Sequence, residues 1–195
     1  MIIYFIEFME ISDKQLVSNY LKGDEKSLEI LIKRYLNPIY SFIYYYINNQ
    51  EEAEDITQEV FIKVWRNLKK FDQSKNFKTW IFSIAKNTCV DKTRKKQKEI
   101  PFSKFENKNG KNTVLETIVD KSLLPNNILE KKETIKLLNS KIKKLSKKYR
   151  QVLILKHNEG LTFQEISNIL KEPVNTIKSR YRRALLHLKE IIIES

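Results

Sequence analysis

The sequence predicts an all-α protein made of two small helical domains joined by a flexible linker. Its 195 residues include only three Gly and four Pro, while 41% are hydrophobic, so the chain can bury a core but has few tight turns. Apolar residues recur at helical spacing over residues 12–98 and again from residue 128. Because a domain typically holds roughly 100–150 residues, this length suits two small modules.

The first module is expected over residues 12–98, with breaks near residues 48–50 and 71–76, where polar side chains interrupt the apolar period. Residues 99–127 contain two Pro, one Gly and no sustained period, and we expect a linker with little fixed structure. The second helical module is expected over residues 128–195.

Residues 1–11 are interpreted as an N-terminal extension that is possibly not native. Met9 begins an ordinary polar helix entry, which leads to the hypothesis that translation starts at Met9 rather than Met1. The apolar run Met1–Ile6 is too short to span a bilayer and lacks the flanks of a signal peptide. We therefore expect neither a targeting segment nor membrane insertion.

Lysine and arginine exceed aspartate and glutamate by 37 to 24, a net charge of +13. This excess favours contact with a polyanion, either nucleic acid or an anionic membrane surface. The single Cys89 excludes an internal disulfide, and with His157 and His187 far apart it gives no zinc-site spacing. We expect no metal, no cofactor and a reducing, cytoplasmic location.

The segment from about Thr162 to Leu188 predicts a helix-turn-helix. Thr162 and Glu165 have the spacing of a reciprocal capping box that starts the first helix, and Pro173 ends it and permits a second. In the second helix the apolar side chains share one face and the basic ones point away, the geometry that enters a major groove. The core face comprises Ile177, Tyr181, Ala184 and Leu188. A merely solvated basic face is the alternative, and the cap, turn and core face together weigh against it.

The helix around residues 54–68 has two contrasting faces. Its wide apolar face is formed by Ile56, Val60, Phe61, Val64, Trp65 and Leu68. Its opposite face is formed by Asp55, Gln58, Glu59, Ile62 and Arg66. An apolar Ile among acids on a basic protein suggests a partner surface, and an ordinary solvated face with one exposed Ile is the alternative.

The next helix, roughly Phe77 to Lys96, aligns Ile81, Ala85 and Cys89 toward a core. A second line carries Trp80, Ser83, Asn87 and Arg94, and the helix ends in a run of cations. An aromatic ring beside amides and cations suits melted nucleic acid, because bases stack on rings and phosphates contact cations. The alternative is that Trp80 is simply a core residue.

Three stretches in this order resemble the bacterial sigma factors: Asp55–Phe61, Trp80–Asn87 with Asp91 and Arg94 beyond it, and Pro173–Arg180. The similarity is to the small extracytoplasmic-function group, which keeps only regions two and four, and it extends from about residue 12 to 189. It implies a non-enzymatic specificity subunit that binds core RNA polymerase and recognises and melts promoters. The first module would dock on the clamp helices and melt the minus-ten element, and the second would read the minus-thirty-five element as duplex. An anti-sigma factor is a further possible partner, and the linker would follow the polymerase's RNA path.

The resemblance also implies residue roles. Polymerase docking would use Asp55, Gln58, Glu59, Ile62 and Arg66. Minus-ten contacts would use Trp80, Ser83, Asn87, Arg94 and Lys95, beside the loop 71–76. Minus-thirty-five contacts would use Asn175, Thr176, Lys178, Ser179, Arg180, Arg182 and Arg183. The family usually places glycines near Lys171 and Asn175, and this chain has neither.

The alternative function is a stand-alone helix-turn-helix regulator whose first module binds a ligand or dimerises. The acidic, partly apolar face around Ile62 favours the sigma factor, because a stand-alone regulator needs no docking face beside a base-stacking face. The sequence has no evident Gly-rich phosphate loop, paired-carboxylate site or Ser/His/Asp arrangement, so it does not suggest an enzyme.

Overall fold

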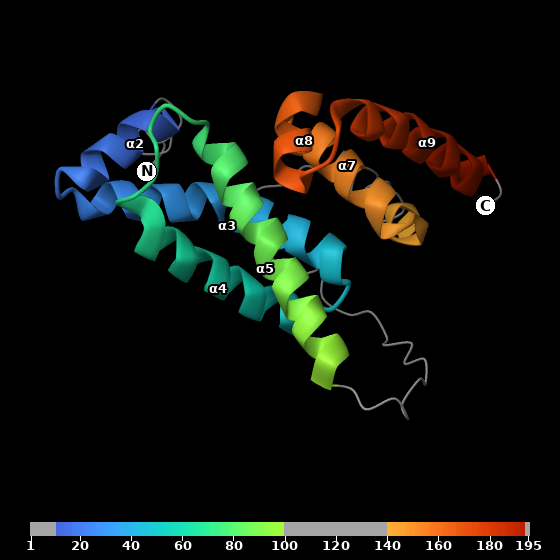
Figure 1. The fold of residues 1–195 in the computed structure, drawn as a ribbon, viewed down its shortest axis with the longest axis horizontal. Helices are drawn as coiled ribbons and strands as arrows, with labels where there is room; N and C mark the ends of the chain where they lie inside the picture. The colour runs from blue at the N-terminus through green and yellow to red at the C-terminus, as the bar shows by residue number, and fades with distance from the viewer. Residues whose placement is uncertain (1–10, 100–139, 194–195) are drawn as a thin grey trace, which may run out of the picture.

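The computed structural model describes residues 11–99 and 140–193, and there the chain is helical, as predicted (Figure 1). The first module contains α2 (Asp13–Leu21), α3 (Glu25–Ile47), α4 (Gln50–Leu68) and α5 (Phe77–Glu99). The second contains α7 (Lys147–His157), α8 (Phe163–Leu170) and α9 (Val174–Ile193), preceded by a helical turn over residues 140–144. The predicted linker 99–127, the start of the second module and the Met9 hypothesis lie outside the described residues, except that residue 99 ends α5.

Polar side chains fix where the helices of the first module begin. Ser12 caps α2 in a reciprocal box with Gln15, and Asp24 caps α3 by accepting from the Lys26 N–H at 3.1 Å. The predicted break at residues 48–50 is confirmed: Asn48 adopts φ 59°, and Asn49 caps α4. Asn has a short polar side chain that tolerates this left-handed conformation, so the chain can reverse without a glycine.

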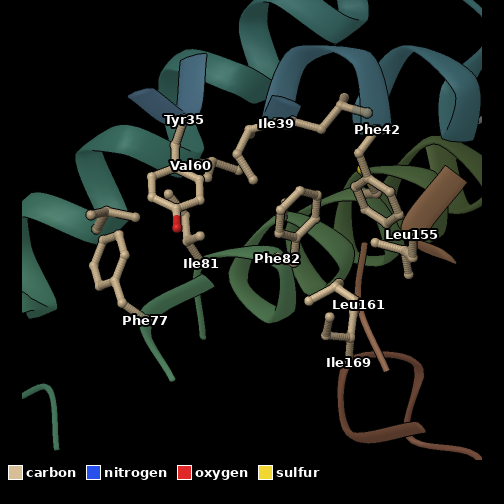
Figure 2. Packing of buried hydrophobic residues seen from close by; sticks show 14 of the residues in the cluster. Tyr35, Ile39, Phe42, Val60, Phe77, Ile81, Phe82, Leu155, Leu161 and Ile169 are labelled. Atoms are coloured by element: carbon tan, nitrogen blue, oxygen red, sulfur yellow. The ribbon is translucent and has the colours of Figure 1, made fainter. Parts of the chain in front are cut away.

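A long central helix, α3, organises the first module by packing against α2, α4 and α5. Its buried side chains meet those of α4 and α5, as Tyr35, Ile39, Val60, Ile81 and Phe82 show in Figure 2. Ile81, Ala85 and Cys89 are buried, which confirms the core face predicted for α5.

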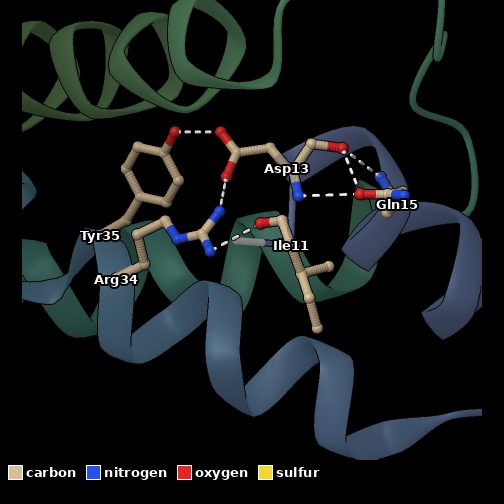
Figure 3. Close-up of polar contacts among 6 residues, drawn as sticks. Ile11, Asp13, Gln15, Arg34 and Tyr35 are labelled. Carbon is tan, nitrogen blue, oxygen red and sulfur yellow. Dashed lines mark hydrogen bonds and ion pairs between the residues drawn. The ribbon is translucent and has the colours of Figure 1, made fainter. Parts of the chain in front are cut away.

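The start of the described chain is tied to α3 by polar contacts (Figure 3). Arg34 donates to the Asp13 carboxylate at 2.5 Å and to the Ile11 carbonyl at 2.8 Å. The Tyr35 hydroxyl donates to the other Asp13 oxygen, and burial with this carboxylate raises the pKa of Tyr35. Ile11 also packs against the core, so this residue of the predicted extension is part of the folded module.

The main hydrophobic cluster spans both modules, and a smaller cluster of Leu145, Leu153 and Ala184 lies within the second module. Helix α3 packs on α7, and α5 packs on α8, while α9 packs on α7 and α8 (Figure 1). Figure 2 shows Phe42 and Phe82 of the first module facing Leu155, Leu161 and Ile169 of the second. We call this contact the module interface; nothing in the spacing of apolar residues had predicted it.

One predicted core residue is wrong. Trp65 was expected on the buried face of α4, but it is 55% exposed, whereas Ile56, Val60, Val64 and Leu68 are buried. Trp65 is seven residues after Gln58, which places it close to the outer face of α4, beyond the edge of the core.

Within residues 11–99 and 140–193, no helix combines the length and apolarity required to cross a bilayer.

Candidate nucleic-acid interface

Helices α8 and α9 form the predicted helix-turn-helix. The Thr162 hydroxyl accepts from the Glu165 N–H at 3.2 Å, and the Glu165 carboxylate accepts from the Thr162 N–H at 2.8 Å, which confirms the capping box. Ile177 and Ala184 are buried, and Tyr181 packs edge-on against Phe163 with ring centroids 5.3 Å apart. These contacts fix α9 on the second module with its basic face outward.

The turn between α8 and α9 forms without glycines at or near Lys171 and Asn175. Lys171 adopts the left-handed conformation, φ 57° and ψ 47°, which a side chain takes up only at some cost. Asn175 lies inside α9 and has no positive φ, so a glycine is not needed there for backbone freedom. The Ser167 hydroxyl donates to the Glu172 carbonyl at 2.5 Å and holds the turn against α8.

Arg180, one of the residues expected to contact DNA, already has a partner within the protein. Its guanidinium pairs with both Glu172 oxygens, at 2.7 and 2.5 Å, and its side chain is only 17% exposed. A bidentate pair of this kind fixes both partners. Arg180 therefore joins α9 to the turn, and its charge is largely neutralised.

The outward surface of α9 combines cations with small polar groups. Lys178, Arg182, Arg183 and Asn175 are exposed, while Ser179 and Thr176 are half-buried. A groove runs from this surface to the start of α7, and its walls include Lys148 and Tyr149, which sequence reasoning missed. Such donors can contact phosphates and the base edges of a duplex major groove.

A second surface follows the outer line of α5. Asn87, Arg94 and Lys95 are exposed, and Ser83 is half-buried with its hydroxyl donating to the Thr79 carbonyl at 2.7 Å. Trp80 and Arg94 lie 14 residues apart, which is roughly 21 Å along a helix. Lys78 and Phe82, which contact the second module, lie on the opposite side of α5, so the module interface leaves this face open.

Trp80 lies at the edge of the core, where it packs against the buried rings of Phe71 and Phe77. Its ring lies 4.7 Å from that of Phe71 and 5.6 Å from that of Phe77, and it is half-buried. The adjoining loop is held by Asp72, which accepts from the Ser74 N–H and hydroxyl at 3.0 and 2.7 Å. The Ser74 hydroxyl, ahead of the Ser74 N–H, lowers the pKa of the Asp72 carboxyl.

Beside these aromatic rings is a cavity of about 150 Å³. It is lined by Asp13, Lys14, Phe71, Gln73, Lys75, Asn76 and Phe77. Aromatic walls with amide and ammonium groups can hold a planar base and a neighbouring phosphate. The sequence indicated the loop 71–76 but not the contribution of Asp13 and Lys14 from α2.

A third surface lies on the outer face of α4. Asp55, Gln58 and Arg66 are exposed, and Ile62 is 47% exposed, so four of the five predicted docking residues face outward freely. Trp65 adds a large apolar ring to this surface. We call these residues together the α4 face; it is acidic at one end and apolar at the other.

Glu59, the fifth predicted docking residue, is half-buried and already has partners. Its carboxylate pairs with Lys63 at 2.8 Å and with Lys92 of α5 at 3.5 Å. The hydrogen bond from Lys63 is the main reason that the pKa of Glu59 is lowered. Glu59 thus links α4 to α5 as well as bordering the α4 face.

None of the described residues forms a cluster of His, Cys, Asp and Glu suited to a metal ion. Burial raises the pKa of the Cys89 thiol to about 12, so it is protonated and unreactive in the closed core. The three surfaces described above have the side chains of binding surfaces.

Comparison with known proteins places the chain in a family. Residues 31–99 match the family "Sigma-70 region 2", and residues 135–188 match "Sigma-70, region 4". The chain is 34% identical over 175 residues to ECF RNA polymerase sigma factor SigW of Bacillus subtilis, covering 90% of this chain and 94% of that protein. It is 29% identical over 175 residues to the ECF RNA polymerase sigma-E factor of Escherichia coli K12, covering 90% and 91%.

Solved structures share the fold. The sigma factor RpoE of Bartonella quintana, determined with the anti-sigma factor NepR, matches with a TM-score of 0.67 and 22% identity, covering 86% of this chain and 97% of that one. CnrH, determined with the cytosolic domain of CnrY, matches with a TM-score of 0.65 and 19% identity, covering 94% and 98%. The family matches and the likeness to SigW together show that the chain belongs to the extracytoplasmic-function group of the sigma-70 family of RNA polymerase sigma factors.

Proposed function

We propose that this sigma factor binds core RNA polymerase through the α4 face and directs initiation through its two DNA-reading surfaces. Residues 12–98 form the docking and minus-ten module, residues 99–127 the linker, and residues 128–195 the minus-thirty-five module. The protein acts in the cytoplasm, where the polymerase and its template are, and it performs no catalysis of its own. One observation carries this proposal: the α4 face is outward and partly apolar, and the same chain presents two separate cationic surfaces.

In the docked complex, the apolar residues of the α4 face form the centre of the contact and its charged and polar residues form the edge. Ile62 and Trp65 together expose a large apolar area that a partner can bury, and aromatic residues often dominate such contacts. Asp55, Gln58 and Arg66 add polar contacts that set orientation. Because Glu59 is held by Lys63 and Lys92, it contributes less to docking than the resemblance alone implies.

The minus-ten element is bound as a melted strand along α5. A base leaves the stack and enters the cavity beside Phe71 and Phe77, while its neighbours contact Trp80 and Asn87. Arg94 and Lys95, about four turns beyond Trp80 along α5, hold the phosphates. The cavity supports this role because its aromatic walls and amides suit a planar base.

The minus-thirty-five element is bound as duplex by α9. Asn175, Thr176, Lys178, Ser179, Arg182 and Arg183 contact the DNA directly. Arg180 positions them by anchoring α9 to Glu172. An anti-sigma factor is a further proposed partner, since the RpoE and CnrH structures that share this fold were both determined in complexes.

The test is run-off transcription with core polymerase on a pool of genomic fragments from the source bacterium, with the transcript starts sequenced. We expect starts to depend on the protein and to share a minus-ten and a minus-thirty-five sequence. A stand-alone regulator would give no starts with core polymerase alone, and that result would refute the proposal.

Docking is tested by a matched pair of variants. Ile62→Ala removes an apolar side chain from the α4 face, and Leu36→Ala removes one that is equally exposed, 45% against 47%, from α3. We expect Ile62→Ala to weaken core-polymerase binding by about tenfold, because a buried interface side chain of this size contributes on the order of 1–3 kcal/mol. Equal binding by the two variants would show that docking occurs elsewhere.

A further inference from the structure

The cavity beside Phe71 and Phe77 has walls from two distant parts of the chain. The loop 71–76 forms one part, and Asp13 and Lys14, in the first turn of α2, form another. The rings of the wall suit a planar base of any kind, because every base has an apolar face. The polar side chains of both parts therefore decide which base the cavity holds.

The backbone of Lys14 is fixed by the polar contacts of its two neighbours. The Arg34 guanidinium donates to one Asp13 oxygen at 2.5 Å, and the Tyr35 hydroxyl donates to the other (Figure 3). Gln15, on the other side, completes the capping box of α2. Lys14 is exposed, and its ammonium has no hydrogen bond or ion pair with the residues that the structure describes. The ammonium can therefore donate to a ligand, whereas both oxygens of Asp13 already have donors.

Asn76, from the loop, also presents a donor to a ligand. Its Oδ1 accepts from the Thr79 N–H at 2.9 Å, at the start of α5. An amide turned the other way would set two donors against each other, so this contact determines which atom is the oxygen. The Nδ2 group of Asn76, with two hydrogens to donate, is the part of the amide that is left for a ligand.

The other polar side chains of the wall add more donors than acceptors. Lys75 contributes a second ammonium, which lies 3.7 Å from the Asp72 carboxylate. Among the residues that line the cavity, Gln73 alone keeps a side-chain acceptor without a donor. The wall therefore suits a ligand that is rich in acceptors.

The four bases differ in how their acceptors are arranged. Guanine presents O6 and N7 side by side, and cytosine presents O2 and N3 side by side, with each pair pointing in one direction. Adenine and thymine alternate a donor with an acceptor along the same edges. Adenine would direct its amino hydrogens at the donors of the wall, and a buried polar group without a partner is costly.

We propose that Lys14 of α2 is a specificity-determining residue for the minus-ten element, and that with Asn76 it selects cytosine or guanine in the cavity. This inference rests on the function proposed above, in which a base of the melted strand enters the cavity. It assigns base selection to α2 as well as to the loop 71–76, because the two donors come from different elements.

The test measures base preference at each position of the minus-ten element. The promoter selected from the genomic pool is remade with this element randomised, transcribed by core polymerase with the full chain, and the transcribed templates are sequenced. We expect one position at which cytosine or guanine exceeds adenine by at least about tenfold. Because each ratio compares bases within one protein, a uniform loss of activity in a variant does not alter it.

Two variants change the donors without removing the rest of the wall. Asn76→Asp keeps an oxygen for the Thr79 N–H and replaces the Nδ2 donor with an acceptor for the adenine amino group, so the ratio at that position should fall by at least about tenfold. Lys14→Met keeps the unbranched stem and removes the ammonium, and the ratio should fall severalfold at the same position. Asn19→Asp and Lys22→Met make the same changes at exposed positions of α2 and its end that do not line the cavity, and they should leave every ratio unchanged.

The possible failures are distinct. If the unmodified chain gives no protein-dependent starts, the proposed function fails and this inference fails with it. If it initiates but adenine or thymine is favoured at every minus-ten position, the choice of base is overturned while the function stands. Equal ratios for Lys14→Met and Lys22→Met would overturn the role of Lys14, and a ratio unmoved by Asn76→Asp would overturn that of Asn76.

Discussion

Replacing Lys171 by glycine should stabilise the protein, because Lys171 holds a left-handed backbone at the end of α8. Its φ of 57° and ψ of 47° cost a residue with a Cβ roughly 1–2 kcal/mol, and glycine adopts them freely. Glycine also gives the unfolded chain more freedom, which offsets part of this gain. The Lys171 side chain is exposed, so little packing is lost. We expect Lys171→Gly to raise the free energy of unfolding by about 1 kcal/mol.

The thermal shift produced by this gain depends on whether the modules unfold together. A gain of about 1 kcal/mol raises the Tm of a unit of roughly 150–250 residues by about 2–4 °C, and that of a unit of roughly 60–100 residues by about 4–8 °C. Since the main hydrophobic cluster spans both modules, we expect one transition and the smaller shift. Two transitions, with only the second-module one shifted, would mean that the modules unfold independently.

The control for charge is Lys171→Ala, which removes the same ammonium but keeps a Cβ. Urea unfolding followed by circular dichroism should show a higher midpoint for Lys171→Gly than for Lys171→Ala, with unchanged slopes. A glycine variant no more stable than the alanine variant would refute the argument from backbone strain.

Three further predictions concern the cap, the turn and pH. Thr162→Ala should lower the free energy of unfolding by about 1 kcal/mol by removing the α8 cap, whereas Thr162→Ser should not; equal urea midpoints would contradict this. Glu172→Gln should weaken binding of the selected promoter duplex severalfold by loosening Arg180, and unchanged anisotropy titrations would count against that positioning role. Burial raises the pKa of both Cys89 and Tyr46 to about 12. In the unfolded chain these groups ionise near about 8.5 and about 10, so the unfolded state loses protons first and stability should fall as pH rises above about 9. Urea midpoints at pH 7 and 10.5 measure this loss, and Tyr46→Phe should reduce it; an undiminished loss in that variant would exclude Tyr46 as a source.

The local parts of the fold were predictable because their signals are short in sequence. Thr162 and Glu165 are three residues apart, and a capping box at that spacing can form in only one way. Asn48 and Asn49 similarly marked the end of α3 and the start of α4. Each of these signals depends on neighbours within one helical turn, which a sequence specifies directly.

The partners of individual side chains were less predictable. Arg180 lies in a basic run, and the sequence did not predict that Glu172, eight residues away across the turn, would bind both of its terminal nitrogens. Trp65 was expected in the core because an apolar arc shows which residues can be buried, not where the covering helices end. In both positions the tertiary neighbour decides, and sequence spacing does not identify it.

The module interface was the least predictable feature, and its composition favours keeping the modules together. Phe42, Phe82, Leu155 and Ile169 follow ordinary helical spacing, so each resembles a core residue of its own module. Separating the modules would expose part of this apolar surface to water, and fully exposing one such side chain costs roughly 1.5–3 kcal/mol. The two modules are therefore expected to unfold as one cooperative unit, which is the reason for the single thermal transition predicted above.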